Sequence, residues 1–169
     1  MTETLQRNGI DALLVGGACV SIYTANKYIS GDLDFVSHGT MKEIAKTLEQ
    51  IGFHKKSSRH FERNDCQFFI EFVAPPAAVG SEPITTPFEL TSKYGKILLL
   101  SPTDAIKDRL AAYYHWNDFQ ALDQAVMVAK DQNVNISEIE RWSIAEGFGE
   151  KYQNFLLSCT PRSRKRKPD

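Results

Sequence analysis

The stretch LVGGACVSIYTANKYISGDLDF, from Leu14 to Phe35, decides which fold this chain adopts. The segment 11–15, apolar from Ala12 onward, predicts a buried strand that leads directly into Gly16 and Gly17. Residues 18–27 predict a helix opened by these two glycines. Backbone N–H groups at such a turn approach an anion closely, so the stretch predicts a phosphate-binding loop.

The second half of the stretch predicts another strand from Leu33, Phe35 and Val36, with Asp32 and Asp34 interleaved. Side chains alternate along a strand, so Asp32 and Asp34 share one face. Two adjacent carboxylates repel unless a cation lies between them, and hard divalent ions prefer oxygen ligands. A third acid, Glu71, interrupts the apolar run FFIEFV. Burying a bare carboxylate is costly, so Glu71 lies at a strand end or is held by a charge, and one shared metal would satisfy all three acids.

Outward from this stretch the chain alternates strands and helices and then becomes helical. Thr40 and Glu43 form a predicted capping box that opens a helix to about residue 50. Strands are expected at 54–61 and 66–73, then a loop and hairpin over 77–100. Ser101-Pro102 predicts a helix start. Helices are expected over 102–115, 118–131, 137–146 and 149–158, the third opened by a capping box at Ser137 and Glu140.

This order predicts an α+β fold, a mixed sheet with flanking helices and a helical C-terminal part. The expected divisions are an α/β core over 1–100, a helical part over 101–160 packed on it, and a basic, disordered tail over 161–169. The tail PRSRKRKPD holds five of the 20 basic side chains and one of the 21 acidic ones. The body keeps 15 basic and 20 acidic residues, a formal charge of −5, which argues against a large nucleic-acid footprint.

Several classes of protein are excluded by composition. No stretch approaches the roughly 20 apolar residues that a membrane-spanning helix needs. The first ten residues mix charged and polar side chains, which a signal peptide does not do. Three cysteines, Cys19, Cys66 and Cys159, share no metal-ligand spacing, so inert thiols in a reducing cytoplasm are expected.

The residues from Leu14 to Phe35 resemble the signature of the DNA polymerase β-like nucleotidyltransferase superfamily: an apolar residue, Gly-Gly, a helix, then Asp-apolar-Asp-apolar. Glu71 in FFIEFVAP matches the third acid of that family, which is usually Asp. Residues 98–129 are similar to the helical region of minimal nucleotidyltransferases related to abortive-infection and toxin–antitoxin systems. The resemblance covers about residues 10–130, and an arginine often found before the acid pair is missing.

The resemblance implies a site. Asp32, Asp34 and Glu71 are then the catalytic and metal-binding residues, with two Mg²⁺ ions (or Mn²⁺) as cofactors. The nucleotide-binding residues it implies are Gly16, Gly17, Ser30, Lys107 and Arg109. In the helical region the family has a basic residue followed by an Asp, and Arg109 (or Lys107) with Asp118 (or Asp123) matches it.

The implied activity is transfer of a nucleoside monophosphate from a nucleoside triphosphate, such as ATP, to a macromolecular acceptor, a protein or a tRNA. Members of this group include toxins, so a toxin with an antitoxin protein as partner is expected. The alternative is a catalytically degenerate copy that serves as a binding or regulatory protein. Metal-dependent phosphate hydrolysis with the same acids is a third interpretation.

One further cluster, His115-Trp116-Asn117-Asp118, lies between two expected helices. Two interpretations stay open for it. It contacts a nucleotide base or an acceptor, or it is a helix–helix junction capped by Asn117.

Overall fold

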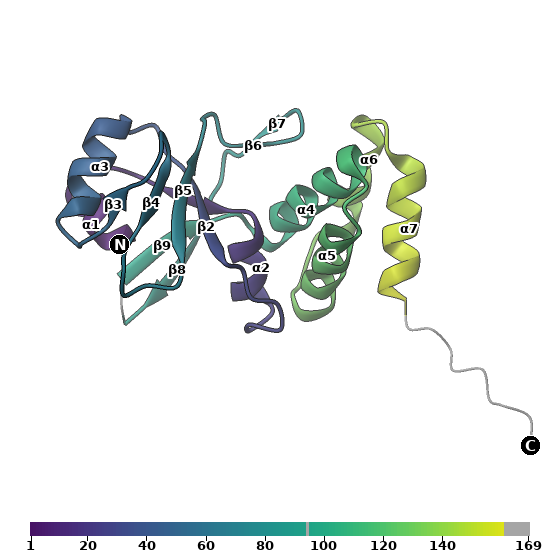
Figure 1. Ribbon diagram of the computed structural model, residues 1–169. Helices are drawn as coiled ribbons and strands as arrows, with labels where there is room; N and C mark the ends of the chain where they lie inside the picture. The colour runs from purple at the N-terminus through teal and green to yellow at the C-terminus, as the bar shows by residue number, and fades with distance from the viewer. Residues whose placement is uncertain (94, 161–169) are drawn as a thin grey trace, which may run out of the picture.

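The computed structural model describes residues 1–93 and 95–160, so the predicted tail, 161–169, lies outside the described residues. The described chain is α+β, a seven-stranded mixed sheet followed by a helical region, as predicted (Figure 1). The first elements are α1 (Thr2–Arg7), β1 (Leu13–Val15), α2 (Gly17–Tyr23), β2 (Asp32–Val36), α3 (Met41–Glu49), β3 (His54–Lys55), β4 (His60–Glu62) and β5 (Phe69–Val73). They are followed by β6 (Ala78–Val79), β7 (Glu82–Pro83), β8 (Phe88–Ser92), β9 (Gly95–Leu99), α4 (Pro102–Trp116), α5 (Phe119–Asp131), α6 (Ile136–Ala145) and α7 (Gly149–Cys159).

The sheet places the acid-bearing strand near its middle. Its strand order is β3-β4-β5-β2-β1-β9-β8. β2 runs antiparallel to β1, to which α2 connects it, and parallel to β5. β1 in turn runs parallel to β9, which leads into α4. A ligand on β2 is therefore close to β5 on one side and to the start of α2 on the other.

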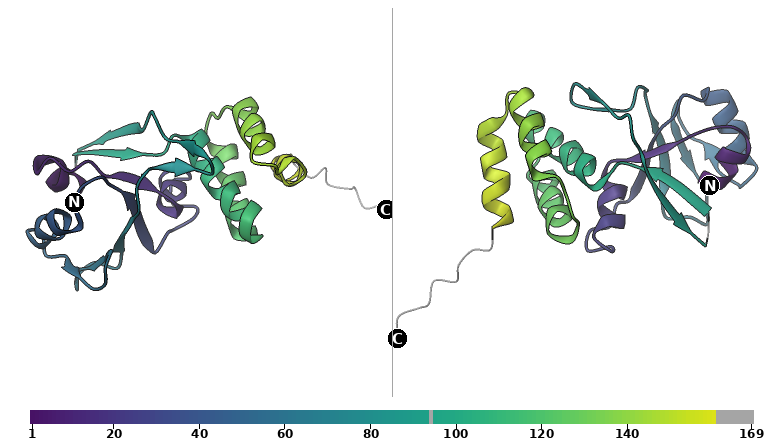
Figure 2. Two further views of the ribbon diagram at one scale, coloured as in Figure 1. Left: turned by 90° about the horizontal axis from the view of Figure 1, so that it is seen from above. Right: turned by 180° about the vertical axis from the view of Figure 1, so that it is seen from behind.

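The helices divide into two groups (Figures 1 and 2). α1 and α3 pack on each other at one end of the sheet. α2 lies between the sheet and the helical region, and it contacts both α4 and α5. α4–α7 form the helical region, which the β6–β7 hairpin reaches by a hydrogen bond from Trp142 Nε1 to the carbonyl oxygen of Val79, at 3.2 Å. We propose that the α/β core and the helical part divide at residue 101, as the sequence predicts, because α4 begins directly after it.

The core confirms the apolar pattern of the sequence. On the face of the sheet opposite the acids, Phe35, Phe61, Ile70 and Phe72 are almost completely buried. Each such side chain stabilises the fold by about 2 kcal/mol through removal of apolar surface from water. None of the described helices is long and apolar enough to cross a membrane.

Three local predictions are wrong. The strand expected at 54–61 is two short strands, because the backbone N–H of Lys56 donates to the carbonyl oxygen of His60 and closes a turn. The helix expected over 18–27 ends at Tyr23, and Ala25 and Asn26 then adopt positive φ.

The capping box expected at Ser137 and Glu140 is absent. α6 starts at Ile136, and Asn135 caps it by accepting a hydrogen bond from the backbone N–H of Glu138. Asparagine is as good an N-cap as serine, so the cap lies two residues before the predicted one and the helix begins one residue earlier than predicted. The capping box of Thr40 and Glu43 is confirmed, with both of its hydrogen bonds present.

Candidate active site

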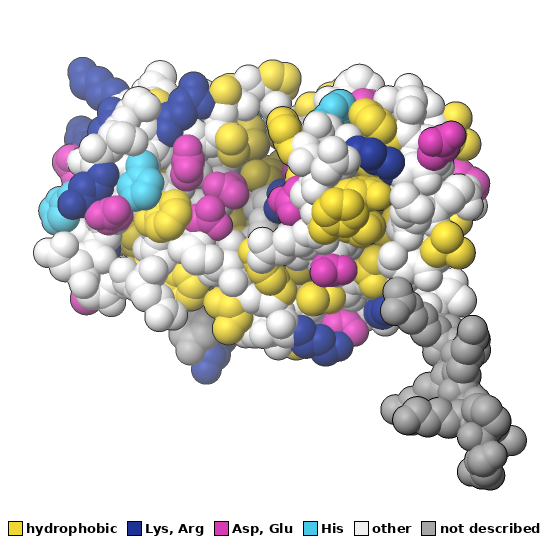
Figure 3. All heavy atoms as spheres, turned by 45° about the vertical axis from the view of Figure 1, so that its right-hand side comes forward, with side chains coloured by type: hydrophobic (Ala, Val, Ile, Leu, Met, Phe, Trp, Pro, Cys, Tyr) yellow, Lys and Arg dark blue, Asp and Glu magenta, His cyan; other side chains and the backbone are white. Residues whose placement is uncertain are grey.

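The three predicted carboxylates lie on one face of the sheet. The register of β2 and β5 pairs Asp34 directly with Glu71. Paired residues of neighbouring strands project to the same side, so Glu71 lies next to Asp34, and Asp32 is two residues along β2 on the same face. Figure 3 shows acidic side chains on both walls of a hollow between the sheet and the helical region. The three acids lie on the face of β2 and β5 opposite Leu33 and Phe35.

The pKa of Asp34 is raised by its surroundings. Burial, then the charges of Asp32 and Glu71, raises its pKa from 3.8 to about 6. Arg109 acts in the opposite direction and lowers the pKa of Asp34. A cation bound beside these partly buried carboxylates would relieve the repulsion between them.

The two glycines make room around these acids. Gly16 has a φ of 68°, and a Cβ added to it would lie 2.6 Å from Oδ2 of Asp34. A Cβ on Gly17 would lie 2.8 Å from Oγ of Ser30. Only a residue without a side chain fits at the start of α2, so the sequence motif Gly-Gly is explained by close packing against the second acid and the loop before the first.

Arg109 comes to the acids from α4. Its Nε and Nη2 both donate to Oδ2 of Asp108, at 3.0 and 2.6 Å, and its Nη1 contacts Oε1 of Gln124 at 3.5 Å. Burial lowers the pKa of Arg109, but the charges of Asp108 and Asp34 outweigh it and the pKa is raised. The guanidinium is a permanent positive charge on the helical side of the carboxylates.

Asp108 and Gln124 were missed by the sequence reasoning. Asp108 directly precedes Arg109 in the sequence, and this adjacency could have indicated that the two side chains form an ion pair. Gln124 is 4% exposed in α5, and nothing in the sequence pattern distinguishes it from other buried helix positions.

Lys107 is not brought to the carboxylates. It is 4% exposed, and its Nζ pairs with Glu138 at 2.6 Å, Glu82 at 3.3 Å and Asp104 at 3.7 Å. Arg141 joins the same cluster through Glu82 and Glu138. The cluster connects α4 to α6 and to the β6–β7 hairpin.

We predict that Lys107→Met lowers stability and leaves transfer by the folded protein unchanged. Its three acidic partners lose a buried cation, although Arg141 remains, so about 2 kcal/mol of unfolding free energy is lost. Urea unfolding and the KM for the triphosphate measure the two effects, with the exposed Lys42→Met as control. A KM that rises strongly for Lys107→Met alone would place Lys107 in the nucleotide site instead.

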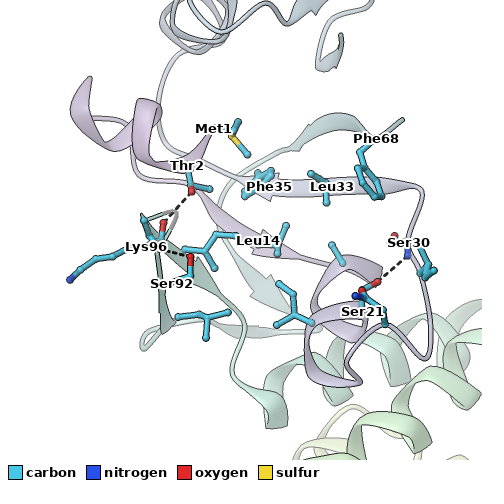
Figure 4. A pocket seen from close by; sticks show the side chains of 17 residues that line it. Met1, Thr2, Leu14, Ser21, Ser30, Leu33, Phe35, Phe68, Ser92 and Lys96 are labelled. Atoms are coloured by element: carbon cyan, nitrogen blue, oxygen red, sulfur yellow. Dashed lines mark hydrogen bonds between the residues drawn. The ribbon is translucent and has the colours of Figure 1, made fainter. Parts of the chain in front are cut away.

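Ser30 holds the first acid. It is 4% exposed, and its Oγ donates to Oδ1 of Asp32 at 2.7 Å. Its backbone N–H donates to Oγ of Ser21 at 2.9 Å (Figure 4). Both serines also line a mainly apolar pocket of about 440 Å³ that extends over Leu33 and Phe35, on the sheet face opposite the acids. Ser30 is thus placed to fix the orientation of Asp32.

Ser30→Ala is therefore expected to weaken apparent Mg²⁺ affinity and reduce transfer by about tenfold to a hundredfold, the usual cost of losing a group that orients a metal ligand. Ser37→Ala is the matched control: Ser37 is also buried and donates at 2.7 Å, but to the carbonyl oxygen of Asp11, away from the acids. A metal titration of activity compares them. Equal affinities for both variants would contradict a positioning role for Ser30.

The residues present fit a magnesium site by the chemistry of their donors. All three are carboxylates, which hard divalent cations prefer. Within residues 1–93 and 95–160, no three acidic, histidine or cysteine side chains already converge on one point as a formed metal site. A bound ion would therefore draw the acids together from their adjacent positions on β2 and β5.

The structure places the glycine pair at a helix start, two acids on the adjacent strand and a third acid on the next strand, the arrangement expected from the resemblance to DNA polymerase β-like nucleotidyltransferases. No protein-family model and no curated protein matches the sequence. Two solved structures nevertheless have the same fold, and each alignment covers nearly the whole of this chain.

One is the solution structure of the antibiotic-resistance factor ANT(2'')-Ia, with a TM-score of 0.57 and 11% sequence identity; the alignment covers 92% of this chain and 90% of that one. The other is the crystal structure of an antigenic nucleotidyltransferase-like protein from Paracoccidioides brasiliensis, with a TM-score of 0.60, 14% identity, and coverage of 94% and 88%. The chain thus has the nucleotidyltransferase fold.

Proposed function

We propose that this protein is a magnesium-dependent nucleotidyltransferase that transfers a nucleoside monophosphate from a nucleoside triphosphate to a macromolecular acceptor, a protein or a tRNA. The observation that carries the proposal is the pairing of Asp34 with Glu71 across β2 and β5, beside a glycine that packs against Asp34. The complete set of acids favours turnover over a degenerate binding protein.

Each site residue has a part in this proposal. Asp32, Asp34 and Glu71 would hold Mg²⁺, which when bound neutralises phosphate charge and activates the acceptor hydroxyl. Gly16 and Gly17 would present backbone N–H groups to the triphosphate at the start of α2. Arg109 offers positive charge to it from α4, and Ser30 keeps Asp32 in place. Most of the catalytic effect then comes from positioning and charge neutralisation.

The acceptor is the least constrained part of the proposal. The resemblance to toxin–antitoxin nucleotidyltransferases supports a toxin role with an antitoxin partner. The acidic body, of formal charge −5, disfavours an acceptor that lies across a large basic surface. Because ANT(2'')-Ia is an antibiotic-resistance factor, antibiotics belong beside proteins and tRNA in a panel of candidate acceptors.

The test is to incubate the protein with Mg²⁺ and each nucleoside triphosphate, labelled either at the α- or at the γ-phosphate, together with the acceptor panel. Transfer of the α-label alone, abolished by EDTA and by Asp34→Asn, is expected. Release of labelled phosphate or of free nucleoside monophosphate without a labelled acceptor would favour hydrolysis. No turnover with any acceptor would favour the binding protein.

A further inference from the structure

Two aromatic side chains stand out of the surface where α4 meets α5. Trp116 is 77% exposed and Phe119 is 65% exposed, which makes them the most exposed aromatic residues in the described part of the chain. Exposed aromatic surface costs free energy, and two such residues within one turn are a feature that binding sites show more than ordinary surfaces do. Figure 3 shows a hydrophobic patch on the helical side of the hollow, across from the acidic side chains of the sheet.

The turn that carries the pair is held firmly. Asn117 ends α4 in the left-handed conformation, and its Oδ1 accepts a hydrogen bond from Nζ of Lys151 at 2.7 Å. Lys151 also donates to the carbonyl oxygen of Tyr114, in the last turn of α4. Asp118 then caps α5 by accepting from the backbone N–H of Ala121 at 3.0 Å. The junction interpretation of this cluster is therefore correct for Asn117 and Asp118, but it does not account for the exposed rings beside them.

The spacing along α4 connects these rings to the proposed nucleotide site. Trp116 follows Arg109 by seven residues, nearly two full turns, so both project from the same face of α4, about 10 Å apart along its axis. α4 itself packs against α2, the helix that the glycine pair opens, and the charge of Arg109 acts on Asp34. That distance is comparable to the span between the phosphates and the base of one nucleotide.

We propose that Trp116, with Phe119 exposed three residues further along the chain, is the stacking platform for the base of the donor nucleoside triphosphate. This inference rests on the proposed function, because it takes the triphosphate to lie between the glycine pair and Arg109. An aromatic face accepts any base by stacking, so the platform supplies affinity without choosing among the four triphosphates. The base and the triphosphate belong to one molecule, which places the base within reach of the same α4 face.

The two tryptophans give a direct optical test. Trp142 is 1% exposed and Trp116 is 77% exposed, so iodide quenches the fluorescence of Trp116 selectively. With Mg²⁺, each nucleoside triphosphate is expected to shield Trp116 from iodide. Inorganic tripolyphosphate with Mg²⁺ should raise the melting temperature without shielding Trp116, because it fills the phosphate site and has no base.

Affinity measurements on variants complete the test. Trp116→Ala is expected to weaken triphosphate binding about tenfold and leave tripolyphosphate binding unchanged, while Trp116→Phe keeps most of the affinity. Leu157→Ala is the matched control, since Leu157 is 71% exposed on α7. Magnesium-dependent triphosphate binding that is insensitive to Trp116→Ala, with no shielding from iodide, would overturn the stacking role and leave the proposed function standing. Failure of both the triphosphates and tripolyphosphate to bind would overturn the two together.

Discussion

Replacing Asp34 with asparagine is expected to reduce nucleotidyl transfer by at least about a thousandfold and to stabilise the metal-free protein at neutral pH. Transfer is lost because the amide is a poor ligand for Mg²⁺ and carries no charge to balance it. Asparagine has nearly the same shape as aspartate, so the packing against Gly16 is kept. Transfer of α-label measures the first effect, and urea unfolding in EDTA measures the second.

The gain in stability follows from the direction of the pKa shift. Burial and the charges of Asp32 and Glu71 raise the pKa of Asp34 to about 6 in the folded protein, above its ordinary value of 3.8. The unfolded state therefore loses its proton first, and the wild type loses stability as the pH rises from about 4 to 6. Above pH 6 the penalty is constant, on the order of 1 kcal/mol once solvent screening is allowed for.

Asp34→Asn lacks this penalty, so its advantage over the wild type should grow between pH 4 and 6 and then stay level. Mg²⁺ should remove the difference by stabilising only the wild type. A variant that is less stable than the wild type at every pH would contradict the account of Asp34 as a repelled carboxylate.

The second large effect is expected for Gly16→Ala. The new Cβ would lie 2.6 Å from Oδ2 of Asp34, and the backbone would carry a non-glycine residue at a φ of 68°. Backbone strain of this kind costs about 1–3 kcal/mol of stability. Displacement of the Asp34 carboxylate adds a loss of activity of about a hundredfold, the usual result of moving a catalytic group by an ångström.

Gly9→Ala separates these two causes. Gly9 has a similar φ of 72°, but a Cβ there would meet nothing within 4 Å. It should lose about 1 kcal/mol of stability through backbone strain alone and keep full activity. If Gly9→Ala and Gly16→Ala proved equally active, the contact between Gly16 and Asp34 would have no part in the site.

Much of the fold could be predicted from local patterns. The strand before Gly16 and the acids of β2 are encoded by residues close together in sequence, and the capping box of Thr40 acts over four residues. Glu71 could also be found from the sequence, because a carboxylate is conspicuous within an apolar strand. The expected cost of burying it does not apply, since Glu71 is exposed in the middle of β5. Its pairing with Asp34 depends on the register of two parallel strands, which no sequence spacing fixes.

The choice between Lys107 and Arg109 shows where sequence reasoning stops. Both are basic residues on α4, two positions apart, and the pattern alone gave no reason to prefer one. The rotation of α4 about its axis decides which of the two side chains faces the carboxylates of the sheet. Packing of α4 turns Lys107 toward the acids of α6 and β7, and Arg109 toward Asp34. That rotation is set by tertiary contacts that only the assembled structure contains.

The most direct test of the central claim is a thermal-shift titration with each of the four nucleoside triphosphates, in Mg²⁺ and in EDTA, on the wild type and on the double variant Asp32→Asn/Asp34→Asn. Ligands that bind only the folded state raise the melting temperature. A shift that requires Mg²⁺ and disappears in the double variant is predicted. No shift with any triphosphate, or an equal shift in the double variant, would contradict a metal-dependent nucleotide site at these carboxylates.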